Sequence, residues 1–415
     1  MNHIKFHLTV LFSMILVGCG GGGDNVPAKP KFSSQVSFGD SLSDVGTYKV
    51  GTVFTLGGGQ FTINGTVPTN WTELTAFKLG LPAPCPAVTG LNGDLTLGFN
   101  VSPTTHAGCT GYAQGGSRVT DPHGLYNSYW PDSASQTIGM LTYPVVTQMQ
   151  NYLASMGGAF NGSELVFVMA GANDVFIQLQ LLKAGATAAA TAAVTAAVPG
   201  QIATDIASRA CVPADVQATN CQPAAVATLI PTVGAAAANT YLTTNAPIAV
   251  AAIGTAAAEL VNDINTLLLE KGAKYVTVAN VPDIGTTPFA SGLDSSSKNL
   301  LNTMIATFNT TLKSGLDALP DQSSLLYVDA NAASHDETVN PASYNLTNVT
   351  NTACNLTQPS PNPLASSLVC NALNLNSGVL ATDHYLFADT VHPTPYGYSL
   401  FATYVLQAMT NKGWY

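Results

Sequence analysis

The chain has 415 residues, of which 46% are hydrophobic and only 9% are charged. A chain of this length and composition can bury a large core and form one to three globular domains. Its formal net charge is −10, with 13 Lys and Arg residues in all. This balance argues against nucleic-acid binding and against electrostatic docking on an anionic membrane.

The N-terminus has the features of an export signal. A short basic start precedes an apolar run from Leu8 to Val17, which is too short to span a bilayer comfortably. The stretch that ends at Cys19, followed by a run of glycines, resembles a bacterial lipobox, in which the Cys becomes the lipidated first residue. We expect residues 1–18 to be a lipoprotein-type signal peptide, Cys19 to be lipidated and residues 19–33 to form a flexible tether. The alternative is an ordinary cleaved signal with an incidental Cys.

Six further cysteines fall into three local groups in loop-like sequence. An even number of cysteines in an exported chain suggests disulfides, and pairing of neighbours is the simplest arrangement. No Cys-x-x-Cys or His-Glu-x-x-His pattern occurs, so we expect neither a metal site nor a cofactor. The predicted disulfides are Cys85–Cys109, Cys211–Cys221 and Cys354–Cys370.

The first predicted strand ends in a turn that contains a serine. Val36 and Phe38 have the spacing of a buried strand, and Gly39-Asp40-Ser41 follows them. A Ser at the tip of a strand exposes its hydroxyl above the sheet, where a nucleophile must lie. By itself, however, Gly-Asp-Ser is an ordinary turn tripeptide.

Between this turn and residue 155 the sequence predicts two helices separated by loops. Trp71 to Leu79 has helical spacing, with Asn70 as a possible cap, and residues 144 to 155 form an amphipathic helix. Residues 83 to 110 read as a long loop. Gly115-Gly116 follows it and permits close backbone approach, with an N–H directed into a cleft.

A second buried strand is expected at residues 165 to 170, where six apolar residues follow one another. Asn173 comes directly after it. Open α/β sheets bind their ligands at the carboxyl ends of such strands. Asn173 is therefore a candidate site residue.

Residues 180 to 270 are rich in Ala and Thr and predict a helical insertion. We expect helices near 183–196, 201–210, 222–238 and 245–270, broken by Pro199, Pro213, Pro223 and Pro231. Because Thr, Gln and Asn recur and no strongly apolar run of 18 residues is apparent, the sequence argues against a membrane span. The insertion is expected to pack on the sheet and could roof the active site.

The C-terminal third again alternates strand and helix. Strands are predicted at 274 to 280 and 325 to 328, and helices at 300 to 319 and 396 to 410. This alternation predicts one doubly wound α/β domain.

Just before the last helix, Asp389 and His392 lie three residues apart. A Ser hydroxyl is a poor nucleophile unless a base lies within hydrogen-bond reach, and that base needs an acid to fix its tautomer. This pair can supply both groups.

Taken together, Gly-Asp-Ser-Leu, the Gly-Gly loop, Gly-Ala-Asn-Asp and Asp-x-x-His-Pro occur in the order found in the SGNH, or GDSL, hydrolases. The chain resembles the bacterial phospholipase, lecithinase or hemolysin branch over residues 34–415, including the stretch from Asn280 to Pro288. The resemblance implies a flavodoxin-like three-layer α/β/α sandwich with a central parallel sheet. It also implies site roles: Ser41 as nucleophile, His392 as base and Asp389 as the acid that orients it. The oxyanion donors would be the Ser41 N–H, the Gly116 N–H (with Gly115 left open) and the Asn173 amide.

The resemblance thus predicts an exported serine esterase or lipase that hydrolyses lipid or other acyl esters through an acyl-enzyme. We expect a monomeric outer-membrane lipoprotein, anchored by its N-terminal lipid, with an ester substrate and no nucleic-acid partner. Two alternatives stay open: a polysaccharide O-acetyl esterase, and a noncatalytic surface lipoprotein that binds lipid or glycan. The Ser117-Arg118 pair after the Gly-Gly loop and the length of the insertion depart from relatives and leave the substrate open.

Overall fold

The computed structural model describes residues 29–65, 69–211, 221–357 and 362–415. The predicted signal peptide and Cys19 therefore lie outside the described residues. Four parallel strands form the central sheet in the order β1-β4-β5-β6. These strands are β1 (Ser34–Gly39), β4 (Glu164–Met169), β5 (Tyr275–Ala279) and β6 (Leu325–Val328).

A further segment extends the sheet beyond β1. The Ser37 N–H donates to the Thr110 carbonyl (3.1 Å), and the Tyr112 N–H donates to the Ser37 carbonyl (2.8 Å). Gly111 is thus paired with Ser37 in parallel orientation. With this segment placed second, the sheet has the 2-1-3-4-5 order of flavodoxin-like folds.

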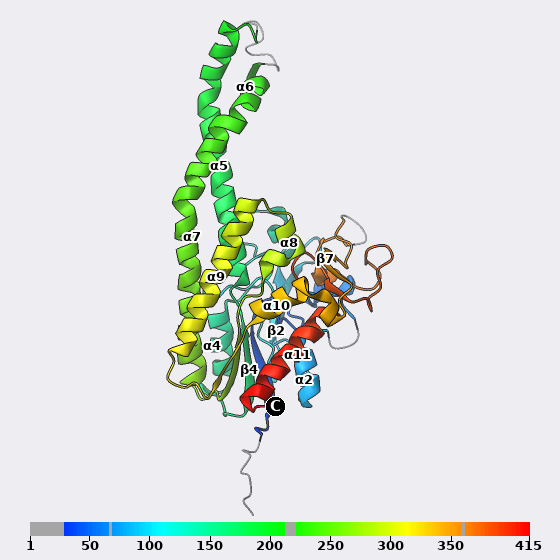
Figure 1. The fold of residues 1–415 in the computed structure, drawn as a ribbon. Coiled ribbons are helices and arrows are strands. Elements are labelled where there is room, and N and C mark those ends of the chain that lie inside the picture. The colour runs from blue at the N-terminus through cyan, green and yellow to red at the C-terminus, as the bar shows by residue number, and fades with distance from the viewer. Residues whose placement is uncertain (1–28, 66–68, 212–220, 358–361) are drawn as a thin grey trace, which may run out of the picture.

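Helices cover both faces of the sheet (Figure 1). Because strand side chains alternate between faces, Val166 and Val168 of β4 contact one helix layer while Leu165, Phe167 and Met169 contact the other. The first layer contains α4 (Val145–Ser155), α7 (Ala235–Asp263) and α9 (Ser295–Asp317), and the second contains α2 (Trp71–Leu79) and α11 (Pro395–Lys412). The predicted three-layer α/β/α sandwich is confirmed.

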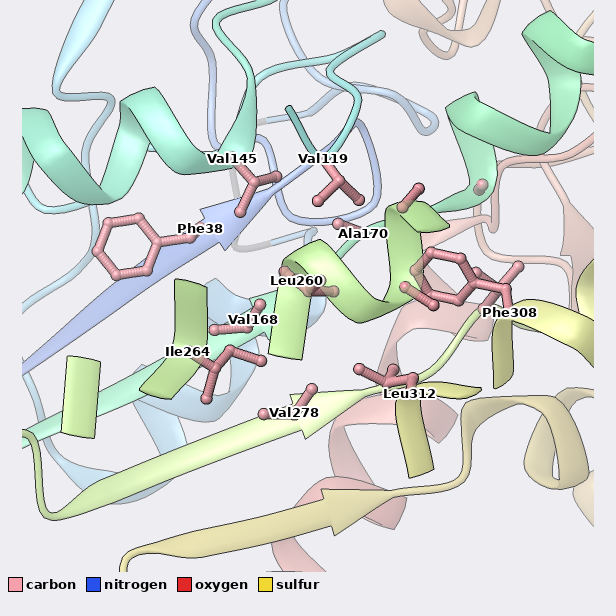
Figure 2. Close-up of a cluster of buried hydrophobic side chains, with 14 of the residues drawn as sticks. Phe38, Val119, Val145, Val168, Ala170, Leu260, Ile264, Val278, Phe308 and Leu312 are labelled. Carbon is pink, nitrogen blue, oxygen red and sulfur yellow. The ribbon is translucent and has the colours of Figure 1, made fainter. Parts of the chain in front are cut away.

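Figure 2 shows how the first layer closes over the sheet. Val168 and Val278 point from neighbouring strands toward Leu260 and Ile264, and all four side chains are fully or almost fully buried. Burying such side chains contributes about 1.5–3 kcal/mol each, relative to leaving them in water. This apolar layer holds the strand ends in fixed positions.

The predicted helix at residues 71 to 79 has well-defined ends. Asn70 caps α2 by accepting from the Thr72 N–H, and the Glu73 side chain accepts from the Asn70 N–H. Gly80 ends the helix in the left-handed conformation, at φ +67°. Helices α4, α9 and α11 also match their predicted positions within a few residues.

The breaks predicted at Pro199, Pro223 and Pro231 in the Ala/Thr-rich region are wrong. Helix α5 (Ala172–Ala207) continues through Pro199, and one continuous helical stretch runs from Cys221 to Leu269. Pro223 lies in the first turn of this stretch, where a missing N–H costs nothing, and a π-helical segment at Ile230–Gly234 accommodates Pro231. Pro213 lies outside the described residues. The second stretch comprises α6 (Cys221–Leu229), η2 (Ile230–Gly234), α7 and η3 (Ile264–Leu269).

These helices project from the body as a two-helix arm, visible at the top of Figure 1, where α5 and α7 run side by side and α6 lies near the far end. We call residues 184–207 and 221–248 the helical arm. Helices Ala172–Ala207 and Cys221–Leu269 are long and apolar enough to cross a membrane by length and composition, and only 17% and 33% of their most apolar windows are buried. The sequence argument against a membrane span is not tested by these averages, but the expectation that the insertion packs on the sheet fails for most of the arm.

The three predicted disulfides are present, and they indicate an exported protein. The Cys85–Cys109 bridge closes a region that was predicted to be a loop but contains a hairpin of β2 (Val88–Asn92) and β3 (Asn100–Thr105). The other disulfides are Cys211–Cys221 and Cys354–Cys370. The remaining elements are α1 (Gly51–Thr55), α3 (Ser133–Ile138), η4 (Ile284–Thr286), α8 (Pro288–Ser291), α10 (Ala330–Val339), η5 (Pro341–Tyr344), β7 (Asn348–Thr352), η6 (Ser367–Val369) and β8 (Tyr385–Phe387).

Candidate active site

Three neighbouring segments of the sheet deliver candidate residues to the same edge. Ser41 follows the end of β1, Gly116 follows the segment paired with β1, and Asn173 lies in the first turn of α5, just after β4. Because all three segments are parallel, their carboxyl ends meet at one edge of the sheet. Ser41, Gly116 and Asn173 accordingly line one cavity.

The structure also brings together the two ends of the chain. The Ser41 Oγ lies 2.8 Å from the His392 Nε2, and the His392 Nδ1 lies 2.8 Å from the nearer Asp389 carboxylate oxygen. Ser41 is only 8% exposed. The Phe61 ring lies against the imidazole, with ring centroids 5.0 Å apart. The three side chains form a continuous hydrogen-bonded chain at the cavity wall.

The Asp389 carboxylate is buried but receives several hydrogen bonds. The backbone N–H groups of Ser367 (3.0 Å), Val391 (2.9 Å) and His392 (2.8 Å) all donate to it. Burial alone would raise the pKa of Asp389, but the neighbouring His392 imidazole and these donors outweigh burial and hold that pKa well below its usual range. Asp389 is therefore ionised at neutral pH, and its charge favours a proton on the His392 Nδ1.

The two glycines of the Gly-Gly loop differ in their hydrogen bonds. The Gly115 N–H donates to a carboxylate oxygen of Asp44 at 2.9 Å, so it is not free to donate to another acceptor. Within the described residues, neither the Gly116 N–H nor the Ser41 N–H has an acceptor. Gly116 has φ +81°, and a Cβ there would lie 2.4 Å from the Leu125 carbonyl oxygen. Only glycine fits this position, and its N–H is the available donor of the pair.

Asn173 is buried at the start of α5. Its Nδ2 donates to the Ser117 carbonyl at 2.8 Å, which uses one of its two N–H bonds. The next residue, Asp174, binds the Arg118 Nε (3.0 Å) and the Val119 N–H (3.1 Å). These contacts fasten the loop after Gly116 to α5. The Arg118 side chain is occupied there and is not among the residues that line the cavity.

Two buried polar residues that sequence reasoning did not single out hold these turns in place. Asp44 accepts from the Gly115 N–H and from two N–H groups of its own turn. Gln148, on the buried face of α4, accepts from the Gly39 N–H and donates to the Gly39 carbonyl, each at 2.8 Å. A Gln at a core position of a predicted helix is the signal that could have identified the second residue.

The cavity that contains Ser41 is large and mostly apolar. Its volume is about 1770 Å³, which exceeds the roughly 300–1,000 Å³ of sites for small molecules. From Ser41 it continues along α5 as far as Pro199 and along the facing part of the second helix of the arm. The helical insertion therefore forms a wall of the site as well as a projection from it.

Comparison with known families gave one match. Residues 224–405 match the family model for GDSL-like Lipase/Acylhydrolase. The matched range contains Asp389 and His392, whereas Ser41, Gly116 and Asn173 precede it. A comparison with curated proteins gave no match.

Asp40, next to Ser41, is expected to lower the stability of the fold in a pH-dependent way. Burial raises the pKa of Asp40 from 3.8 to about 7, although the Leu42 N–H donates to it and His392 lies nearby. Because the folded pKa is the higher one, ionising Asp40 costs stability progressively as pH rises from about 4 to about 7. Asp40→Asn keeps an oxygen for Leu42 and removes this cost. The variant should gain on the order of a few kcal/mol over wild type at about pH 8, and much less at about pH 5, in denaturant unfolding.

The control is Asp94→Asn. Hydrogen bonds from Thr96 and Leu97 lower the pKa of this exposed carboxyl, so it is ionised at both pH values in both states. Its effect on the free energy of unfolding should not change between the two conditions. An Asp40→Asn effect that is equally independent of pH would contradict the assignment.

Proposed function

Since the chain belongs to the SGNH/GDSL hydrolase family, whose members act on ester bonds, we propose that it is a serine esterase or lipase that works through an acyl-enzyme. The observation that supports this most directly is the hydrogen-bonded chain from Ser41 through His392 to Asp389. This is the arrangement that a serine nucleophile needs.

In this proposal the Ser41 Oγ attacks the ester carbonyl carbon while its proton passes to the His392 Nε2. His392 then gives the proton to the leaving alcohol as the C–O bond breaks, and Ser41 keeps the acyl group as an ester. Water, deprotonated by His392, attacks this ester and releases the acid and free Ser41. Asp389 stays ionised throughout and stabilises the imidazolium that forms in each step.

Negative charge on the carbonyl oxygen needs donors that are already in place. The N–H groups of Ser41 and Gly116 supply two, and the second amide N–H of Asn173 supplies a third. The free donors and the shared cavity support this assignment. Preorganised donors of this kind are worth about 10²–10³ in kcat each.

The apolar cavity supports an acyl or lipid ester as substrate rather than a sugar acetate, because an acetyl group needs no such space. We also propose that the protein is an outer-membrane lipoprotein anchored through Cys19, on the strength of the lipobox-like sequence. The three disulfides agree with export but not with one membrane in particular.

Ser41 and His392 should act as one unit. Ser41→Ala and His392→Ala should each remove most of the ester-hydrolysis rate, and the double variant should be little slower than either, because both residues serve the same proton transfer. A fluorophosphonate probe should label Ser41 and label it much more slowly in His392→Ala. The matched control is Ser43→Ala, a change at a neighbouring buried serine, which should keep the rate and the labelling. Labelling of another serine, or losses that multiply in the double variant, would refute the assignment.

Asn173→Ala should lower kcat by about a hundred- to a thousand-fold, because it removes an oxyanion donor. It also breaks the hydrogen bond to Ser117, so a modest fall in Tm is expected. Asn309→Ala provides the comparison, since Asn309 likewise donates to a backbone carbonyl, that of Val281, but lies outside the catalytic cavity. Asn309→Ala should lower Tm at least as much and leave kcat unchanged. A parallel fall in kcat in both variants would show that Asn173 is structural.

Lipidation at Cys19 is tested by mass spectrometry of the N-terminal peptide. The mature protein should begin at Cys19 and have acyl chains on its N-terminal peptide, and Cys19→Ser should lack that mass while hydrolysing esters at the same rate per molecule. An unmodified N-terminus in the wild-type protein would refute the anchor.

A further inference from the structure

We propose that the helical arm enters the hydrocarbon region of a phospholipid layer and that the cavity along it guides an acyl chain from that layer to Ser41. The second half of this statement rests on the proposed ester hydrolysis, and the first half does not. Two properties of the arm are unexpected for a segment surrounded by water alone: it has few charged residues, and apolar side chains are exposed on its surface.

The arm has almost no charge. No Asp, Glu, Lys, Arg or His occurs from Ala184 to Thr204 or from Cys221 to Ile248. In the described residues, charged groups stand only at its limits: Lys183 at the base, and Asp205 and Arg209 toward the tip. By contrast, α9 on the body has Lys298, Lys313 and Asp317 on its surface. The 21 residues from 184 to 204 rise about 31 Å, close to the thickness of a bilayer's hydrocarbon core.

The threonine hydroxyls of the arm do not depend on water for hydrogen bonds. All nine threonines of the arm donate their hydroxyl to the carbonyl four residues earlier on the same helix, as Thr187 does to Lys183 and Thr240 does to Ala236. An unsatisfied hydroxyl would make transfer into an apolar phase costly, whereas one bonded within its helix greatly reduces that cost. The threonines therefore add little to the cost of moving the arm out of water.

Apolar side chains are also exposed along the arm. Ile230 is 57% exposed, Val233 is 36% exposed and Ile248 is 64% exposed. Most other exposed positions of both helices hold Ala or Thr. These residues give the arm an apolar surface with no charged rim that would orient a protein partner.

The cavity connects this surface to the catalytic residues. On α5 it is lined by Ala186, Ala190 and Val194, and on the facing helix by Gly234, Ala238 and Leu242, each set spaced by four residues. Four of these six residues are Ala or Gly, and their small size leaves a mostly apolar groove between the helices. From Asn173 to Val198 the groove follows α5 for about 38 Å, at 1.5 Å per residue. An elongated apolar chain fits this shape, and a compact polar ligand does not.

These observations favour a lipid layer over a protein as the occupant. A second copy or a protein partner would cover the arm without using a groove that ends at Ser41. A lipid layer accounts for the length of the uncharged helices, for their lack of charge and for the groove. It also contains the acyl chains that the groove would bind. Since the protein has a net charge of −10, attraction to anionic headgroups does not contribute.

Binding is measured on the full chain with Cys19→Ser and Ser41→Ala, so that neither a lipid anchor nor hydrolysis interferes. This protein should float with phosphatidylcholine vesicles. Adding Val233→Glu and Ile248→Glu should weaken binding at least about tenfold, because each places a charge in hydrocarbon. Neither residue lines the cavity.

The matched control adds Phe77→Glu and Leu380→Glu, at apolar positions on the body that are 71% and 63% exposed. It should bind vesicles as tightly as the starting protein. The proposal is overturned if the starting protein does not float, if both pairs weaken binding equally, or if sedimentation shows a dimer that only the arm charges dissociate while vesicle binding is absent. Circular dichroism confirms that each variant keeps its helices.

The groove is tested with Ser41 intact. Thr191 is exposed and lines the groove, whereas its neighbour Ala192 is exposed and does not. Thr191→Trp should lower kcat/KM for p-nitrophenyl palmitate at least about tenfold and leave p-nitrophenyl acetate within about twofold, because only the long chain needs the groove. Ala192→Trp should leave both values unchanged. Equal values for Thr191→Trp and wild type on palmitate would refute the acyl path.

Failure of the proposed ester hydrolysis and failure of the proposed lipid binding give different results. If Ser41 is not a nucleophile, wild type hydrolyses neither ester, yet vesicle flotation is still measured because it needs no hydrolysis. If the arm does not bind lipid, acetate is still hydrolysed and flotation is absent.

Discussion

The hydrogen bond between Ser41 and His392 joins residues 351 positions apart, so the site exists only if both ends of the chain reach the same edge of the sheet. The turn at Gly39 makes this possible for Ser41. A Cβ at Gly39 would lie 2.1 Å from the Met169 carbonyl oxygen, and only glycine lets the end of β1 lie this close to β4. Gln148 then fixes the Gly39 peptide from the helix layer above. The position of the nucleophile therefore depends on backbone packing as much as on its own side chain.

Asp389 depends on a different part of the chain. A buried carboxylate is tolerated only when donors surround it, and one of its donors is the Ser367 N–H. Ser367 lies three residues before Cys370, whose disulfide to Cys354 is fully buried beside Ala388. The disulfide-closed loop thus has a chemical role as well as a structural one, because it holds one of the N–H groups that, with the His392 imidazole, keep Asp389 ionised.

The sequence was most informative where periodicity and local motifs coincide. The strand at residues 165 to 170, the capped helix after Asn70 and the three disulfides follow from local patterns and were predicted correctly. The β2–β3 hairpin was missed because its strands are short and polar, and the helix breaks were misplaced because a proline removes only one hydrogen bond from a helix stabilised along its length. Likewise, no local pattern indicates that the Gly115 N–H donates to Asp44 while the Gly116 N–H stays free. That distinction arises from a contact between residues 71 positions apart.

Helix α5 connects the candidate active site to the helical arm. Helix α5 begins with Asn173 in its first turn and continues without interruption into the arm. Its start is fixed at Gly171, at φ +110°, where a Cβ would lie 2.2 Å from the Phe308 ring, and by the pairing of Asp174 with Arg118. An uninterrupted helix transmits position along its axis. A molecule that contacts the arm is therefore held at a defined distance and orientation from the Asn173 amide. For a substrate with a reacting carbonyl at one end and a long apolar chain behind it, this geometry lets chain binding far from Ser41 contribute to positioning the carbonyl.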